Sequence, residues 1–414
     1  MTNEILSEAR RGNADAQCRL GISYARGELG LKIDEKQAIY WLQRAASQGQ
    51  SEALYYLGCC FDEGFGVVRS ETRAALLFRK AAERGNSDAQ TKLGVILQFG
   101  RGGLQDPREA VIWYQKAAAQ KNGDALSNLG LCYMNGTGVP ADCRKGVELF
   151  RQAAENGNDS GIYNLGLSYM RGKGVTKDEV KAAELFRKAA EQGLVKAQCQ
   201  YAKCCETGCG VPQNDAEAVE WYRKAAAKKN PEAQFCLAYA YSNGVGVPPD
   251  IDQALFWCLK AAEQGHVSAQ TNLGYHYLVG TGVPRDLSEA VSWFRKAAYQ
   301  DYPTAQNCLG NCYYHGDGVR QNFFEAAKWY YVAADKGDSD AQLNIGNCFA
   351  SGKGVRRNLT EAAAWYRKSA EQGNSVAQLA LAECYLKGNG VPEDLKEAEY
   401  WISKVESRCT GLAK

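Results

Sequence analysis

The residues best suited to chemistry in this sequence are its sixteen cysteines and three histidines. The densest group is Cys308-x3-Cys312-x2-His315, which places three soft ligands within two turns of a helix. Zinc prefers four tetrahedral nitrogen or sulfur ligands, and no further Cys or His nearby in sequence supplies the fourth. We therefore favour packing of these cysteines in a core over metal binding, and expect no metal and no cofactor.

Other catalytic signatures are missing or wrongly placed. The recurrent Gly-x-Gly-Val, as at Gly138-Val139, follows a helical pattern and not a strand, so it is not a dinucleotide-binding loop. There is no Gly-rich phosphate loop with its Lys, and no arrangement resembling Ser-His-Asp. We expect no catalytic residues and no enzymatic activity.

Arg-Lys pairs recur along the chain and could form a basic stripe for phosphate or acidic lipid. Glutamates close by, such as Glu184, Glu191 and Glu220, offset their charge, so we favour a solvated outer face. The pairs are Arg79-Lys80, Arg187-Lys188, Arg223-Lys224, Arg295-Lys296 and Arg367-Lys368.

Composition sets broader limits. The net charge is only +2 and charged residues make up 23% of 414, so no overall field favours nucleic acid or an acidic membrane. The N-terminus has no apolar signal segment, and eighteen consecutive apolar residues occur nowhere. We expect a cytoplasmic chain with free thiols and no direct membrane insertion, and leave export by a specialised system open.

The chain is built from one repeated unit. Each repeat has a small anchor residue, and from Ala53 onward successive anchors are 36 residues apart, with a first step of 37. The anchors are Ala16, Ala53, Ala89, Ala125, Gly161, Ala197, Ala233, Ala269, Ala305, Ala341 and Ala377. We number positions within a repeat from this anchor.

The residue pattern within each repeat predicts two helices. Large apolar residues at position four and aromatics at position eight, such as Leu129 and Tyr133, form one helical stripe. A Gly at position eleven, as at Gly136, predicts the end of that helix, and a polar cap such as Asp142 predicts the start of the second. The second helix carries an aromatic or Leu and then Ala-Ala, and all eight tryptophans share one slot in it.

A helix pair of this kind cannot bury both faces alone, so the repeats must stack. We predict one all-α repeat domain over 1–414, with a capping helix at 4–15, eleven repeats over 16–406 and a tail at 407–414. More polar residues at the last repeat, Val405-Glu406, favour a capped, complete and monomeric rod.

The pattern, followed nearly throughout from Ala125 to Asn158, resembles the Sel-one-like repeat, a relative of the tetratricopeptide repeat. The resemblance covers residues 5–406. It implies a right-handed α/α superhelical solenoid whose first helices line a concave surface, and an adaptor that binds another protein or a peptide. We keep two alternatives open, a regulatory activator of a membrane or envelope enzyme and a weak hydrolase.

Cysteine placement bears on the hydrolase alternative. Secreted cysteine-rich relatives pair one Cys on each helix of a repeat, and a penicillin-handling activity has been attributed to some of them. Here the second helix bears a Cys at only one place, Cys258, so that pairing is absent. Six cysteines share position seven of the first helix, where small residues pack in a core. They are Cys60, Cys132, Cys204, Cys312, Cys348 and Cys384.

Positions two, three, six, nine and ten of the first helix lie off the packing stripe, and the resemblance places them in the concave groove. Asn recurs there, and its amide can both donate to and accept from a peptide backbone. An alternative is that Asn belongs only to the repeat pattern. The candidate groove residues are Tyr55, Asn128, Tyr163, Asn164, Arg171, Lys203, Phe235, Tyr239, Asn272, Tyr275, Asn307, Asn311, Asn344 and Asn347.

Overall fold

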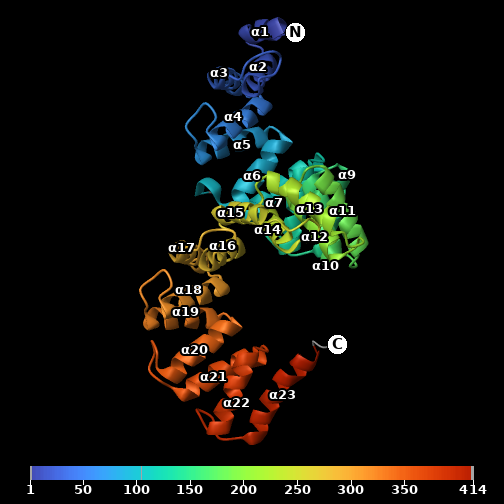
Figure 1. Cartoon of the computed structure of the whole chain (residues 1–414). Coiled ribbons are helices and arrows are strands. Elements are labelled where there is room, and N and C mark those ends of the chain that lie inside the picture. The colour runs from blue at the N-terminus through green and yellow to red at the C-terminus, as the bar shows by residue number, and fades with distance from the viewer. Residues whose placement is uncertain (1, 104, 412–414) are drawn as a thin grey trace. The chain divides into compact units, whose positions relative to one another are not determined.

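The computed structural model describes residues 2–103 and 105–411, and within these ranges every regular element is a helix. The predicted all-α solenoid of eleven helix pairs is confirmed. The chain divides into two compact units, residues 1–213 (unit 1) and 214–414 (unit 2), which we describe separately. Within each unit the helices stack in chain order (Figure 1).

The helix bounds follow the repeat. Unit 1 contains α1 (Thr2–Arg10), α2 (Ala14–Arg26), α3 (Glu35–Ser47), α4 (Ser51–Glu63), α5 (Glu71–Glu83), α6 (Ser87–Phe99), the short η1 (Arg101–Gly103), α7 (Pro107–Ala119), α8 (Gly123–Asn135), α9 (Cys143–Glu155), α10 (Asp159–Arg171), α11 (Glu179–Glu191) and α12 (Val195–Thr207). Unit 2 contains α13 (Asp215–Ala227), α14 (Pro231–Asn243), α15 (Ile251–Glu263), α16 (Val267–Val279), α17 (Leu287–Ala298), α18 (Pro303–His315), α19 (Phe323–Asp335), α20 (Ser339–Ser351), α21 (Leu359–Glu371), α22 (Ser375–Lys387) and α23 (Leu395–Gly411). Even-numbered helices from α2 are the first helices of repeats and odd-numbered helices from α3 are the second.

The predicted helix ends are confirmed. Gly136 ends α8 with φ of 72°, in the left-handed region that other residues resist. Asp142 then caps α9 by accepting a hydrogen bond from the backbone N–H of Lys145 at 3.0 Å. The first helices have their own caps, as where Asn122 accepts from the N–H of Ala125 at 3.0 Å.

Small residues at position five allow the two helices of a repeat to pack closely. A Cβ on Gly274 would lie 2.6 Å from the ring of Phe294, which is fully buried on the partner helix. A side chain therefore cannot be accommodated there without moving the aromatic ring.

A buried glutamine at position one links neighbouring helices, and this feature was missed in the sequence. Gln90 donates through Nε2 to the carbonyl of Ala82 at 3.0 Å. Its Oε1 accepts from Gln120, at the end of the second helix, at 2.9 Å. Leu126 occupies position one of another repeat and cannot accept such a hydrogen bond. The residue thirty positions later is Asn156, which donates instead to the carbonyl of Lys121. Each pair therefore satisfies a polar group that would otherwise be buried without a partner.

The ends of the chain differ from their predicted bounds. The first helix covers Thr2–Arg10, and Asn13 already caps α2, so 11–15 do not extend it. The backbone of α23 continues to Gly411, so the helix includes 407–411 of the predicted tail. Residues 412–414 of the predicted tail lie outside the described residues.

The predicted burial of the cysteines at position seven is confirmed for all six. Burial raises the pKa of the Cys258 thiol to about 12, which disfavours its reactive thiolate. Ten of the fifteen described cysteines are buried, and all fifteen are free thiols. The prediction that Cys258 is the only cysteine of a second helix is wrong, because Cys143 begins α9 in the same repeat as Cys132, although both are free.

We expect the ten buried thiols to react with a thiol reagent at pH 8 only after denaturant is added, because the fold shields all ten and burial raises the pKa of nine of them. Counting reactive thiols before and after unfolding measures this. Half or more of the cysteines recovered as disulfides would contradict both the free-thiol and the core-packing assignments.

Candidate functional site

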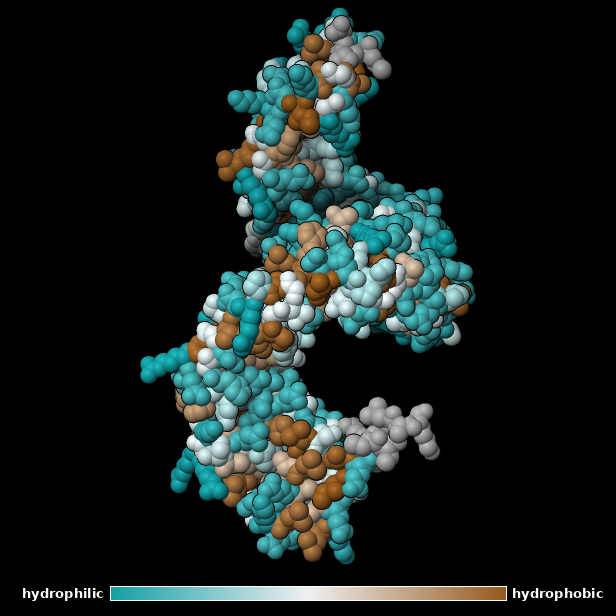
Figure 2. Space-filling model, in the orientation of Figure 1, coloured by the Kyte–Doolittle hydropathy of each residue, from teal (hydrophilic) through white to brown (hydrophobic). Residues whose placement is uncertain are grey.

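The first helices of neighbouring repeats contact one another in unit 1. Asn164 of α10 donates through Nδ2 to Oγ of Ser127 on α8 at 3.1 Å. Position three of one repeat therefore lies beside position two of the preceding one. Ser127 at position two is buried, whereas Asn164 at position three is partly exposed. On the face drawn in Figure 2, hydrophilic residues cover most of the surface.

Three hollows lie along the first helices of unit 1. The first, of about 290 Å³, is lined by Tyr55, Lys92, Ser127 and Asn128 among others. The second, of about 500 Å³, shares Ser127 and Asn128 with the first and adds Tyr163.

The third hollow, of about 90 Å³, shares Leu131 and Asn164 with the second and extends to Arg171. The shared walls make the three hollows one groove that crosses the first helices α4 to α12 of unit 1. We call it the unit 1 groove and define it by the predicted residues that line it: Tyr55, Asn128, Tyr163, Asn164 and Arg171.

Aromatic rings in this groove are held in place. The Tyr55 ring lies 5.9 Å from Phe78 and the Tyr163 ring lies 5.6 Å from Phe186, measured between centroids. Burial raises the pKa of Tyr163, while the charge of Arg171 lowers it. Both hydroxyls therefore stay protonated donors near neutral pH.

Asn128 lines the groove with a polar amide. Its amide is half-buried and makes no hydrogen bond with the part of the chain that the structure describes. A donor and an acceptor are thus available to a ligand at the place where two hollows meet.

Carboxylates at the first turns of the helices form one wall of the groove, and the sequence analysis missed them. Asp88 accepts from Nδ2 of Asn122, and Asp124 accepts from Nδ2 of Asn158, each at 2.8 Å. These residues look like ordinary favourable charges at helix N-termini. They line the groove because residues of the next repeat lie beside them. The spacing of residues within one repeat does not predict this contact.

Asn side chains at the corresponding positions of unit 2 form hydrogen bonds within the protein. Asn344 donates to Oδ1 of Asn307 at 2.9 Å, and Asn311 accepts from the Tyr330 hydroxyl at 2.6 Å. Asn307 is 7% exposed, which corrects its predicted place off the packing stripe: Asn344 of the next repeat reaches over it. Asn347 accepts from the hydroxyl of Tyr366 at 2.8 Å.

The other predicted residues differ in their surroundings. Phe235 stacks on His266 with centroids 4.6 Å apart, and Tyr239 is 52% exposed. Tyr275 approaches Sγ of Cys308 through its hydroxyl at 2.8 Å. Asn272 of α16 and Lys203 of α12 are exposed.

The structure does not bring the side chains of Cys308, Cys312 and His315 to one place. Both cysteines are buried while His315 is exposed on the same helix. In the described residues, no group of three His, Cys, Asp or Glu side chains is placed to hold a metal ion.

Arg side chains on the second helices form hydrogen bonds with the following repeat, and the adjacent Lys side chains lie over Trp rings. Arg295 donates to the hydroxyl of Tyr313 in the next repeat at 3.2 Å, while the following Lys296 lies 3.5 Å above the ring of Trp293. The pairs Arg223-Lys224 and Arg367-Lys368 make the same contacts with a Tyr hydroxyl and a Trp ring.

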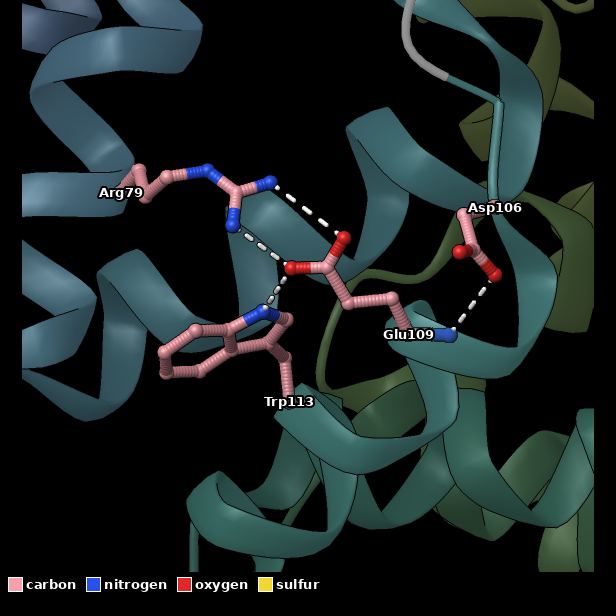
Figure 3. A network of polar contacts seen from close by, with 4 residues as sticks. All are labelled: Arg79, Asp106, Glu109 and Trp113. Atoms are coloured by element: carbon pink, nitrogen blue, oxygen red, sulfur yellow. Dashed lines mark hydrogen bonds and ion pairs between the residues drawn. The ribbon is translucent and has the colours of Figure 1, made fainter.

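Arg79 shows why this pattern varies. The usual tyrosine is replaced by Leu97, and Arg79 instead contacts Glu109 of the next repeat at 2.6 Å (Figure 3). Glu109 also accepts from Nε1 of Trp113 at 3.1 Å. The Arg79 guanidinium, through this hydrogen bond, lowers the pKa of the Glu109 carboxyl below its usual 4.5.

We expect Glu109→Gln to destabilise the chain at pH 7 and to have no effect in strong acid. A carboxyl with a depressed pKa stabilises the fold above its unfolded pKa, and this contribution is lost as pH falls through the folded pKa, below 4.5. Urea unfolding of both proteins from pH 7 downward measures the difference, with Arg79→Gln as the matched partner. An effect independent of pH would contradict the ion pair as its cause.

Comparison with known proteins decides the family. The Sel1 repeat family matches eleven consecutive segments, 14–50, 51–86, 87–122, 123–158, 160–194, 195–230, 231–266, 267–302, 303–338, 339–374 and 375–404. The chain belongs to the Sel1 repeat family. Proteins of this family generally mediate protein–protein interaction and are typically non-catalytic scaffolds.

Solved structures agree. The crystal structure of c5321, a protective antigen of uropathogenic Escherichia coli strains with an SLR fold, is 36% identical with a TM-score of 0.73, over 97% of this chain and 86% of that one. A Sel1 repeat protein from Oxalobacter formigenes is 30% identical with a TM-score of 0.55, over 59% of this chain and 96% of that one.

A curated relative is similar over a short stretch. The ERAD-associated E3 ubiquitin-protein ligase component HRD3A of Arabidopsis thaliana is 32% identical over 59 residues, which is 14% of this Sel1-repeat chain. The match spans only 9% of the length of that relative. Among the described residues of this chain, no helix is both long and apolar enough to cross a membrane.

Proposed function

We propose that this Sel1-repeat protein is an interaction scaffold that binds an extended segment of a partner protein in the unit 1 groove. The observation that carries the proposal is the series of hollows with shared walls, lined by fixed aromatic rings and an amide without a partner in the described chain. Binding sites of this kind combine apolar lining with a few placed polar groups.

The spacing of the repeats suits an extended ligand. Packed helices lie about 8–10 Å apart, and an extended chain advances about 3.3–3.6 Å per residue. Successive repeats would therefore meet about every third residue of the partner. Asn128 and Asn164 would contact its backbone, and Tyr55 and Tyr163 would pack against its side chains.

Selection of binding sequences from a random peptide display library, followed by calorimetric titration of the selected peptides, tests the proposal. We expect peptides that bind the full chain in a one-to-one ratio and compete with one another. Failure to select any peptide, or selected peptides whose binding is unchanged by Asn128→Trp, which would fill the meeting point of two hollows, would contradict it.

A further inference from the structure

A second surface of interest lies on the loops of unit 2. Residues 316–322 join α18 to α19, and residues 352–358 join α20 to α21. Gly354 of the second loop packs against the backbone of Phe323 and Phe324 at the start of α19, so the two loops are neighbours. In Figure 1 both loops lie on the same side of the orange part of the chain.

These two loops carry an unusual concentration of positive charge. Arg320 and Arg356 are exposed and occupy the same repeat position, two residues before the cap of the second helix. Neither forms a hydrogen bond or ion pair within the described part of the chain. Five other repeats have proline at this position: Pro140, Pro212, Pro248, Pro284 and Pro392.

Two further cations stand beside them without a carboxylate partner among the described residues. Lys353 donates to the hydroxyl of Tyr314 at 3.1 Å, and Arg357 donates to the carbonyl of Ala350 at 3.0 Å. The nearby Glu325 is paired with Lys328 at 3.8 Å. Four cations against the single loop carboxylate of Asp317 leave the two loops positive, a local excess that the net charge of +2 conceals.

Large apolar side chains protrude along the same edge. Phe324, in the first turn of α19, is 67% exposed and directly adjoins the charged loops. Leu395 and Ile251, at the starts of α23 and α15, are 68% and 39% exposed. Cations flanking exposed apolar residues are the composition of a surface that adsorbs to lipid headgroups.

We propose that this loop edge, defined by Arg320, Phe324, Lys353, Arg356 and Arg357, adsorbs unit 2 to an anionic lipid surface. The four cations lie at the level of the lipid phosphates, and Phe324 enters the boundary between headgroups and acyl chains. A lipid surface is favoured over an acidic protein because lipid headgroups can move to contact all the protruding side chains at once. An acidic protein would need a surface complementary in shape to these side chains. The site is separate from the unit 1 groove and does not depend on it.

Co-sedimentation of the full chain with vesicles tests this. We expect binding to vesicles of phosphatidylserine and phosphatidylcholine in equal parts, none to phosphatidylcholine alone, and a decline with salt. Each cation removed lowers binding about fivefold, so Arg320→Glu with Arg356→Glu should lower it at least about twenty-five-fold. Phe324→Ser should lower it about fivefold to tenfold.

The matched control is Arg10→Glu with Arg11→Glu, the same charge change at two exposed arginines in unit 1. It should bind vesicles as the unaltered protein does, apart from a small effect of net charge. Absence of binding to the anionic vesicles, or an equal loss with the control, would overturn the proposal. Binding to soluble polyglutamate but not to vesicles would assign an acidic polypeptide to the site and overturn it as well.

Discussion

Phe294→Ala should lower the free energy of unfolding of unit 2 by about 3–5 kcal/mol. The Phe294 side chain is fully buried and lies against Gly274, whose position has no side chain to relax into the cavity. Because each repeat contacts only its neighbours, the loss should be greatest around α16 to α20 and small in unit 1. Urea unfolding with hydrogen exchange resolved by peptide measures both the magnitude and the location.

Tyr299→Ala is the matched control for Phe294→Ala. Tyr299 follows the same helix, but it is 71% exposed, and its ring makes a T-shaped contact with Trp329 with centroids 5.8 Å apart. We expect a change of at most about 0.5–1 kcal/mol. Equal destabilisation by the two substitutions, or a uniform loss of protection along the whole chain, would contradict the nearest-neighbour account of stability.

Tyr163→Ala should weaken the binding of a selected peptide by about 30-fold to 1,000-fold, the range for an aromatic anchor at the centre of an interface. Asn128→Ala should weaken it about tenfold, since one or two hydrogen bonds to the peptide backbone are lost. The two differ in their effect on the fold. Asn128 makes no hydrogen bond with the described chain, whereas Tyr163 contacts Phe186, so only Tyr163→Ala should also reduce stability.

The control for these groove variants is Tyr40→Ala, which removes an exposed tyrosine from a second helix of the same unit. Calorimetric titration should show unchanged affinity for this variant. If Tyr40→Ala abolishes binding while Asn128→Ala and Tyr163→Ala leave it intact, the ligand lies on the face of the second helices.

Most of the fold follows from the repeat in the sequence. Residues equivalent to Gly136 and Asp142 recur at fixed intervals. The glycine ends the first helix and the polar residue caps the second, so these helix ends could be predicted from the sequence. The end of the final helix was predicted wrongly at 406, because α23 runs on to Gly411. The glycine after a second helix does not decide its end, since α7 and α13 end at the usual position with Lys121 and Lys229 in its place.

The candidate site could be predicted only in part. The spacing places Asn128 and Asn307 in neighbouring slots of the first helix, yet one faces a hollow and the other is buried under Asn344. That difference follows from the position within the repeat, because position two is buried at Thr91, Ser127 and Thr271 as well. The glutamine pairs and Asp88 depend on contacts between helices and were missed for that reason.

Placing a photo-crosslinking amino acid at position 128, and separately at the exposed position 112 of α7, tests the central claim most directly. With a selected peptide bound and the mixture irradiated, mass spectrometry identifies the residue to which the peptide is joined. We predict an adduct from position 128 that excess unlabelled peptide suppresses, and none from position 112. An adduct from position 112 alone would show that the unit 1 groove is not the binding site.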